Sequence, residues 1–132
     1  MATEGTPYQG LDYAASKLYV SSVLSLVAYT NAANSLSDAT VYADLTQPAS
    51  ANGYAPILLN GVFTSTNGTV TYDHGTPDNP RWTATGSWGT TVNGIAMVDV
   101  SAGKILHFRD CAVPFVAANL RKLDVDLTTL LT

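Results

Sequence analysis

The residues best suited to acid–base chemistry are the two histidines, His74 and His107. A hydrolytic site needs a nucleophile, a base and an orienting acid within reach of one another. Neither histidine has such a setting in the sequence, and Gly86-Ser87-Trp88-Gly89 lacks the strand-to-helix context of a nucleophile elbow. We therefore predict that the protein is not an enzyme, and we name no catalytic residue.

A second candidate for chemistry is the segment with His107, Arg109 and Cys111, which share one face at strand spacing. Such a cluster could form a Cys/His site. A polar strand face with a buried thiol that behaves as a small apolar group is the favoured interpretation. Because Cys111 is the single cysteine, it permits no internal disulfide and no Cys-based zinc site. No metal and no cofactor are expected.

The longest polar connection runs from Asp73 to Pro80 and supplies the candidate binding residues Asp73, His74, Asp78 and Asn79. Their oxygen atoms could bind Ca²⁺, but the spacing does not match an EF-hand. The simpler interpretation is a turn-rich loop at the rim of a sheet, a place where binding residues often lie.

The two tryptophans, Trp82 and Trp88, lie in or near predicted strands. Aromatic side chains dispersed over strands are expected to form the core and cross-strand pairs. A carbohydrate-binding module that uses them for stacking stays as an alternative function.

The composition limits the possible partners. A chain of 132 residues has room for one domain, and only 12% of its residues are Asp, Glu, Lys or Arg. The net charge is −4, with no basic run longer than Arg121-Lys122, so nucleic acid is not an expected partner. No stretch is apolar enough to span a membrane, and residues 1–10 do not resemble a signal peptide. We expect synthesis and assembly in a cytoplasm.

The N-terminal part is expected to form an extended arm over residues 1–10 and one amphipathic helix over about 11–29, capped by Asp12. Lys17 is the only charge in that helix beyond the cap, so the helix should pack on more than one surface. Candidate partner contacts are Thr6, Pro7, Tyr8 and Lys17.

The rest of the single domain, residues 11–132, shows period-two patterns over about 39–127. Four Asn-Gly pairs mark turns, because both central residues of a tight hairpin turn need positive φ. We predict a mainly β protein, an antiparallel β-sandwich or jelly-roll-like fold with one N-terminal α-helix. The expected strands cover residues 41–45, 54–59, 62–65, 69–72, 81–85, 94–100, 104–110, 113–117 and 120–127.

As a set, several short segments resemble small virion proteins of tailed bacteriophages, which include head-decoration and tail-fibre-like proteins. The segments are Thr40 to Thr46, Asn52 to Ala55, Trp82 to Gly86, Gly94 to Asp99, Ser101 to Phe108 and Lys122 to Leu127. The resemblance implies a β-sandwich that assembles as a homo-oligomer on the particle and has no enzymatic activity.

We therefore expect a capsid decoration or cement protein, located in the virion and assembled in the cytoplasm of a bacterial host. Its expected partners are the major capsid protein or other virion proteins and further copies of itself, with a trimer favoured. A tail or fibre adaptor is the alternative within the virion.

Overall fold

The computed structural model describes residues 8–20, 22–75, 79–118, 121–125 and 127. These residues form one short N-terminal helix and antiparallel strands, which confirms the prediction of a mainly β protein. The elements are α1 (Tyr8–Ala15), the π-helical turn η1 (Ser16–Val20), β1 (Ser25–Tyr29), the 3-10 turn η2 (Tyr42–Asp44), β2 (Ile57–Leu58), β3 (Val62–Thr66), β4 (Thr69–Asp73), β5 (Arg81–Thr83), β6 (Val92–Asp99), β7 (Lys104–Phe115) and β8 (Lys122–Asp124).

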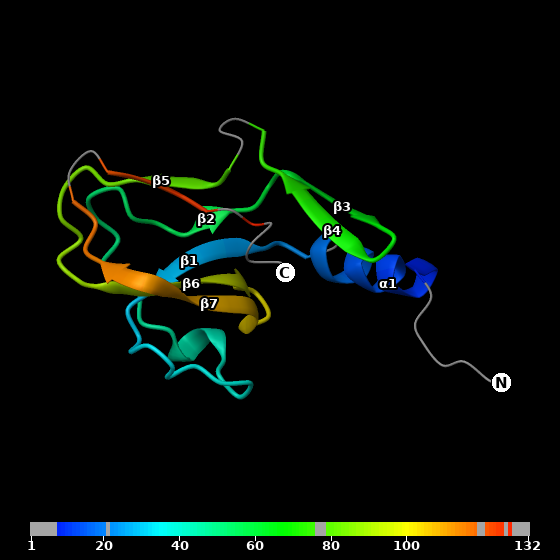
Figure 1. Ribbon diagram of the computed structural model, residues 1–132, viewed down its shortest axis with the longest axis horizontal. Coiled ribbons are helices and arrows are strands. Elements are labelled where there is room, and N and C mark those ends of the chain that lie inside the picture. Colours follow the sequence, from blue (N-terminus) through cyan, green and yellow to red (C-terminus); the bar gives the residue numbers. More distant parts are fainter. Residues whose placement is uncertain (1–7, 21, 76–78, 119–120, 126, 128–132) are drawn as a thin grey trace.

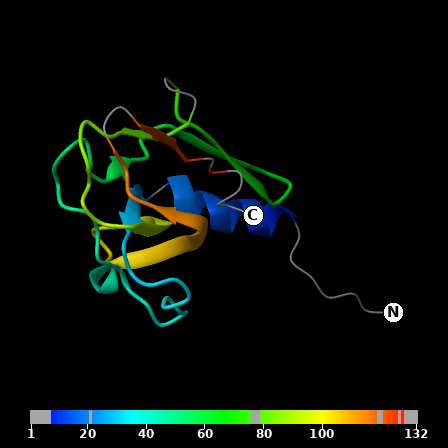
Figure 2. The same cartoon turned by 60° about the vertical axis from the view of Figure 1, so that its left-hand side comes forward.

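A four-stranded antiparallel sheet in the order β2-β1-β6-β7 forms the centre of the molecule (Figure 1). Two further strand pairs accompany it, the β3–β4 hairpin and the β5–β8 ribbon. In both views α1 lies beside the β3–β4 hairpin (Figure 2). None of the sheets in the described part of the chain is closed, so the sandwich or jelly-roll arrangement stays a prediction.

The central sheet is covered on both faces. Leu26, Ala28 and Met97 belong to the main core, together with Trp82 of β5 and Val125 just after β8. The opposite face carries a second cluster of Val27, Tyr29, Ala96 and Val98, on which Leu36, Tyr42 and Leu45 of the loop after β1 pack. All five residues of β1 are therefore buried, whereas an antiparallel strand with one wet face would alternate.

The prediction of a single helix over 11–29 is wrong. The helical segment ends at Val20, and Ser25–Tyr29 form the strand β1 between β2 and β6. A short apolar run that is buried on both faces has no period of two, so the pattern does not distinguish it from a helix. The helix also starts at Tyr8, which places Asp12 inside α1 rather than at its N-cap and residues 8–10 outside the arm.

The prediction of a strand at 41–45 is also wrong, because Tyr42–Asp44 form a 3-10 turn. The Asp44 carboxylate accepts a hydrogen bond from the backbone N–H of Val41 at 3.0 Å, which stabilises the turn. The Asn31 side chain donates to the Asp44 carbonyl at 2.9 Å and accepts from the Thr46 N–H at 2.8 Å, so the loop is held to the end of β1. Tyr42 and Leu45 pack on the sheet, whereas Val41 and Ala43 are exposed, so the side chains in this turn do not follow the alternation that predicted a strand.

The Asn-Gly pairs have different roles. Asn67 and Gly68 have φ values of 51° and 80° and connect β3 to β4, as predicted. Asn93-Gly94 is not a turn but lies inside β6. The ring of Tyr29 covers residue 94 so closely that a Cβ there would lie 2.0 Å from Cζ of Tyr29. Glycine is needed at this position for space rather than for a positive φ.

The other predicted strands exist with changed lengths. The strands expected at 62–65 and 69–72 are confirmed, and those at 54–59, 81–85 and 120–127 are shorter. The runs at 104–110 and 113–117 join into one strand, β7, of 12 residues.

Candidate interaction surface

Tyr19 fixes the N-terminal helical segment to the rest of the molecule. Its hydroxyl forms a 2.6 Å hydrogen bond with Nε2 of His107 on β7, and its ring stacks on Phe63 of β3 at 5.3 Å between centroids. Burial raises the pKa of Tyr19 and lowers the pKa of His107, so both groups favour their neutral forms. One side chain thus joins the helical segment to both the central sheet and the hairpin.

The outer side of the helical segment leaves large apolar side chains in contact with solvent. Leu11 of α1 and Leu18 of η1 are 40% and 44% exposed. Tyr13 is exposed as well, with the Lys17 ammonium 5.4 Å from its ring centroid. Lys17 is itself exposed, so a partner could reach it.

The structure shows less of the contact residues that were predicted in the arm. Tyr8 is the first residue of α1, and Thr6 and Pro7 lie outside the described residues. The structure therefore locates only the helical part of the expected contact region.

A second apolar surface follows directly on η1. Val23, Leu58 and Val62 are 66%, 49% and 65% exposed and line a common hollow. Tyr19 and Phe63 also line it. We call Val23, Leu58 and Val62 the apolar patch. Adjoining exposed apolar side chains of this kind are a candidate interaction surface.

Two of the candidate binding residues of the loop after β4, Asp73 and His74, form hydrogen bonds within or close to that loop. Asp73 ends β4, and its Oδ1 accepts the N–H of Gly75 at 2.9 Å. The hydroxyl of Tyr72 accepts the N–H of Gly61 at 2.9 Å and lies 2.6 Å from Nδ1 of His74.

Asn79 is exposed, and Asp78 lies outside the described residues. No group of three potential metal ligands occurs among the residues that the structure describes. The rim loop stays a candidate binding site on the basis of its position alone.

The structure does not bring His107, Arg109 and Cys111 together as one site. His107 and Arg109 pair with Met97 and Ile95 on the adjacent strand, which places them on the same face as predicted. His107 bonds to Tyr19, whereas Arg109 and Cys111 line a different cavity. Cys111 packs against the main core, and burial raises the pKa of its thiol. The thiol behaves as a small apolar group, in line with the favoured interpretation.

The tryptophans are core residues, as predicted. Trp82 and Trp88 are 3% and 6% exposed, and both rings pack against Tyr54. Their indole N–H groups donate to the carbonyls of Ala55 at 2.7 Å and Asn52 at 3.0 Å. Indole rings held in this way do not form an exposed platform for stacking sugar rings.

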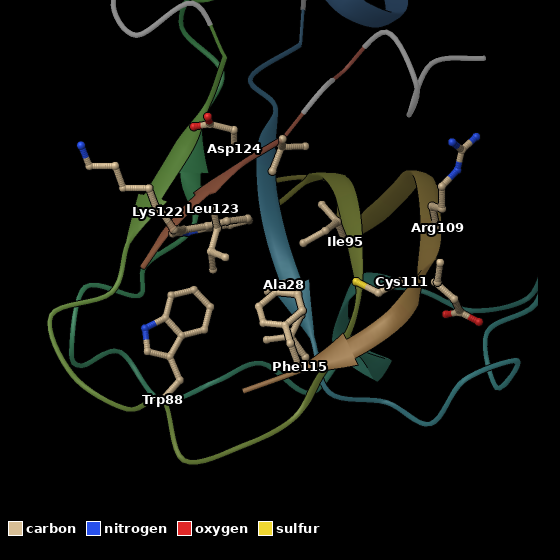
Figure 3. Close-up of a pocket in the computed structure, with 14 residues that line it drawn as sticks. Ala28, Trp88, Ile95, Arg109, Cys111, Phe115, Lys122, Leu123 and Asp124 are labelled. Atoms are coloured by element: carbon tan, nitrogen blue, oxygen red, sulfur yellow. The ribbon is translucent and has the colours of Figure 1, made fainter. Parts of the chain in front are cut away.

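A cavity of about 490 Å³ lies between the central sheet and the β5–β8 ribbon (Figure 3). No local pattern in the sequence points to this cavity, because its walls come from strands that are distant in the chain. The lining side chains include Trp82, Trp88, Ile95, Arg109, Cys111, Phe115, Lys122, Leu123, Asp124 and Val125.

Fold and surface together define a mainly antiparallel β protein with a helix docked at one end and apolar side chains exposed beside it. No protein-family model matches the sequence, and comparison with curated proteins and with solved structures finds no match. In the described part of the chain, no helix has the length and apolar character needed to cross a bilayer.

Proposed function

We propose that this protein is a non-enzymatic structural protein of a bacteriophage virion, most simply a capsid decoration or cement protein that bridges subunits of the shell. The proposal rests on the resemblance of its short segments to phage virion proteins. In this role the protein adds buried interface area between neighbouring capsid subunits and so stabilises the particle against internal pressure. Its partners are the major capsid protein or other virion proteins, and further copies of itself.

The observation that supports this proposal most is the exposure of the apolar patch and of apolar side chains on the helical segment. Val23 and Val62 are each about two-thirds exposed, at 66% and 65%, and Leu11 and Leu18 are exposed as well. Burying apolar surface contributes roughly 25 cal/mol per Å². A neighbouring subunit that covers this region would gain stability that the isolated chain does not have.

The free edge of the central sheet offers a second contact. β7 is the edge strand, and no strand among the described residues pairs with its outer side. Val113 of β7 is 77% exposed. Long, unprotected edges pair readily with an extended segment of another chain, which forms main-chain hydrogen bonds along the strand. We propose that the N-terminal arm of a neighbouring copy binds here, within a trimer.

The sandwich arrangement belongs to the same proposal. The β5–β8 ribbon contributes Trp82 to the core of the central sheet, and the β3–β4 hairpin contributes Phe63 to its margin. We propose that these strand pairs act as the second, incomplete layer of a sandwich. In that arrangement the apolar patch lies at an open end, where a neighbouring subunit would complete the structure.

Electron microscopy of purified particles that carry a tagged copy of this protein tests the location. Label distributed over the shell is the expected result. Label confined to one vertex or to the tail would replace the decoration protein by the tail or fibre adaptor. Particles without any label would contradict the virion proposal.

The arm can be tested separately. Because residues 8–10 belong to α1, the deletion should remove residues 2–7 only. We expect the shortened protein to unfold at the same temperature and to bind shells more weakly. Equal binding of the shortened and full-length proteins would contradict a role for the arm.

A further inference from the structure

The cavity between the central sheet and the β5–β8 ribbon has the size and walls of a small-molecule site. Its volume of about 490 Å³ falls within the range of roughly 300–1,000 Å³ that is usual for such sites. Figure 3 shows the side chains of Trp88, Ile95 and Leu123 directed toward one space. Phe115 and the Cys111 sulfur also border it. These groups form apolar walls, which favour contact with hydrocarbon over contact with water.

The charged side chains of the lining do not point into the cavity to meet a ligand. They are two cations, Arg109 and Lys122, and two carboxylates, Asp110 and Asp124, so their formal charges cancel. In Figure 3 the charged ends of Arg109 and Lys122 are directed away from the space, on opposite sides of it. Asp124 forms an ion pair with Arg81. A charged group inside the cavity would therefore find no cation or free ion pair to balance it.

The other polar groups of the walls already have hydrogen-bond partners. The indole N–H groups of Trp82 and Trp88 donate to backbone carbonyls at 2.7 and 3.0 Å. The Asp110 carboxylate accepts the Tyr29 hydroxyl at 2.6 Å and the Asn34 N–H at 2.7 Å. Among the residues that the structure describes, no buried side-chain nitrogen or oxygen lacks a partner. A polar ligand group would leave water without an unpaired buried side chain to bind, which is unfavourable.

From these observations we infer that the cavity binds a neutral, apolar small molecule, made largely of hydrocarbon rings or chains. Its body lies between Trp88, Ile95 and Leu123, and it carries no charge because the interior of the cavity offers none to balance it. The affinity comes from the apolar surface that is removed from water on both sides. This inference is independent of the proposed virion function.

Two dyes that share one ring system test the charge of the ligand. N-Phenyl-1-naphthylamine is neutral, and 8-anilino-1-naphthalenesulfonate is the same molecule with a sulfonate group added. Both become brighter in apolar surroundings. We expect saturable binding of the neutral dye, and binding of the sulfonate that is weaker by about tenfold or more, because its charge finds no partner in the cavity. Absence of binding of the neutral dye, or equal or tighter binding of the sulfonate, would overturn the inference.

The single cysteine of the chain reports whether the neutral dye occupies this cavity. Cys111 is half-buried and lines the cavity, whereas the apolar patch lines a different hollow. Saturating N-phenyl-1-naphthylamine should slow the alkylation of Cys111 by iodoacetamide severalfold, because the bound ring covers the sulfur. An unchanged rate of alkylation at saturation would place the dye elsewhere and contradict the inference.

Two variants separate the cavity from the apolar patch. Cys111→Phe should weaken the binding of the neutral dye by about tenfold or more, because the new ring fills the space. Val62→Ser is the control and should leave the binding unchanged, since Val62 belongs to the apolar patch and does not line the cavity. Loss of binding in Val62→Ser but not in Cys111→Phe would overturn the inference.

If Cys111→Phe does not fold, the comparison of the two dyes and the alkylation of Cys111 in the unchanged protein carry the test. None of these results depends on whether the protein is found on a phage particle.

Discussion

At the scale of single residues, one row of three paired residues connects three strands of the central sheet. Tyr29 on β1 lies opposite Gly94 on β6, and Gly94 lies opposite Asp110 on β7. The Tyr29 ring crosses Gly94, and its hydroxyl donates to Asp110 at 2.6 Å. This hydrogen bond, with a second from the Asn34 N–H, lowers the pKa of Asp110, while burial and the Asp110 carboxylate raise the pKa of Tyr29. Glycine at 94 makes the row possible.

The variant Gly94→Ala tests this close contact. We expect it to lower the free energy of unfolding by about 1–3 kcal/mol, because the added methyl group forces the Tyr29 ring out of place. Denaturant unfolding monitored by circular dichroism measures the loss. In a Tyr29→Ala background the same substitution should have little effect, since the two side chains are in contact and couple. An equal loss in both backgrounds would contradict the explanation.

The histidine at the helix contact predicts a pH dependence. Burial lowers the pKa of His107 below its ordinary value of 6.5, so the unfolded chain binds more protons than the folded protein near that pH. Stability should therefore fall as the pH drops from about 7.5 to about 5.5. The pKa values of Asp110 and Asp124 are lowered below 3.8, which places their titration outside this window.

Thermal unfolding across this pH range measures the effect. In His107→Gln the glutamine does not titrate, so the slope with pH should become smaller. A variant with the same slope as the original protein would show that His107 does not cause it.

At the scale of elements, the helical segment is attached through a few contacts. Tyr19 of η1 is 8% exposed and meets both β3 and β7, and Ala15 is half-buried against the same core. Most other side chains of the segment are exposed, including Leu11, Tyr13 and Leu18. Such an element should open more readily than the central sheet, because local stability follows the number of buried contacts.

Tyr19→Ala should detach this segment. Removing a buried aromatic side chain costs about 3–5 kcal/mol. Hydrogen exchange should become faster across residues 8–20 while β1 and β6 stay protected. Tyr13→Ala is the matched control, because Tyr13 is 67% exposed on the same segment and its loss should change stability by less than about 0.5 kcal/mol. Uniformly faster exchange in the whole sheet would mean that the segment is part of the global unfolding unit.

At the scale of the whole molecule, the two sides of the structure differ. The central sheet is buried on both faces, whereas the apolar patch and the helical segment leave large apolar side chains in solvent. Under the proposed function, a neighbouring subunit would cover these side chains.

Introducing charge into the apolar patch tests that conclusion. We expect Val23→Glu/Val62→Glu to shift the oligomeric state toward the monomer and to weaken particle binding about tenfold or more, since an unpaired charge is costly to bury in an interface. Light scattering after size-exclusion chromatography measures the first effect. Val100→Glu is the control, because Val100 is 47% exposed in the turn after β6, outside the patch. If Val100→Glu has the same effect as the patch variant, the patch is not the interface.

Short-range sequence patterns predicted the parts of the fold that depend on neighbouring residues alone. Asn67-Gly68 predicted the β3–β4 turn, because the two positive φ values are a property of these two residues. The alternation after Lys122 predicted that Leu123, Val125 and Leu127 face inward, and Val125 and Leu127 are indeed buried. The same reasoning failed for 25–29 and 41–45, where the apolar pattern is shared by different structures.

The mainly β class, the hairpin at Asn67-Gly68 and the core role of the tryptophans could be predicted from residue type and short-range spacing. Three other features become visible only in the folded chain: Ser25–Tyr29 is a central strand, Gly94 lies beneath Tyr29, and Trp82, Cys111 and Leu123 share one cavity. Each of these depends on which distant strands become neighbours. That choice is made by the packing of the whole chain, and no local pattern contains it.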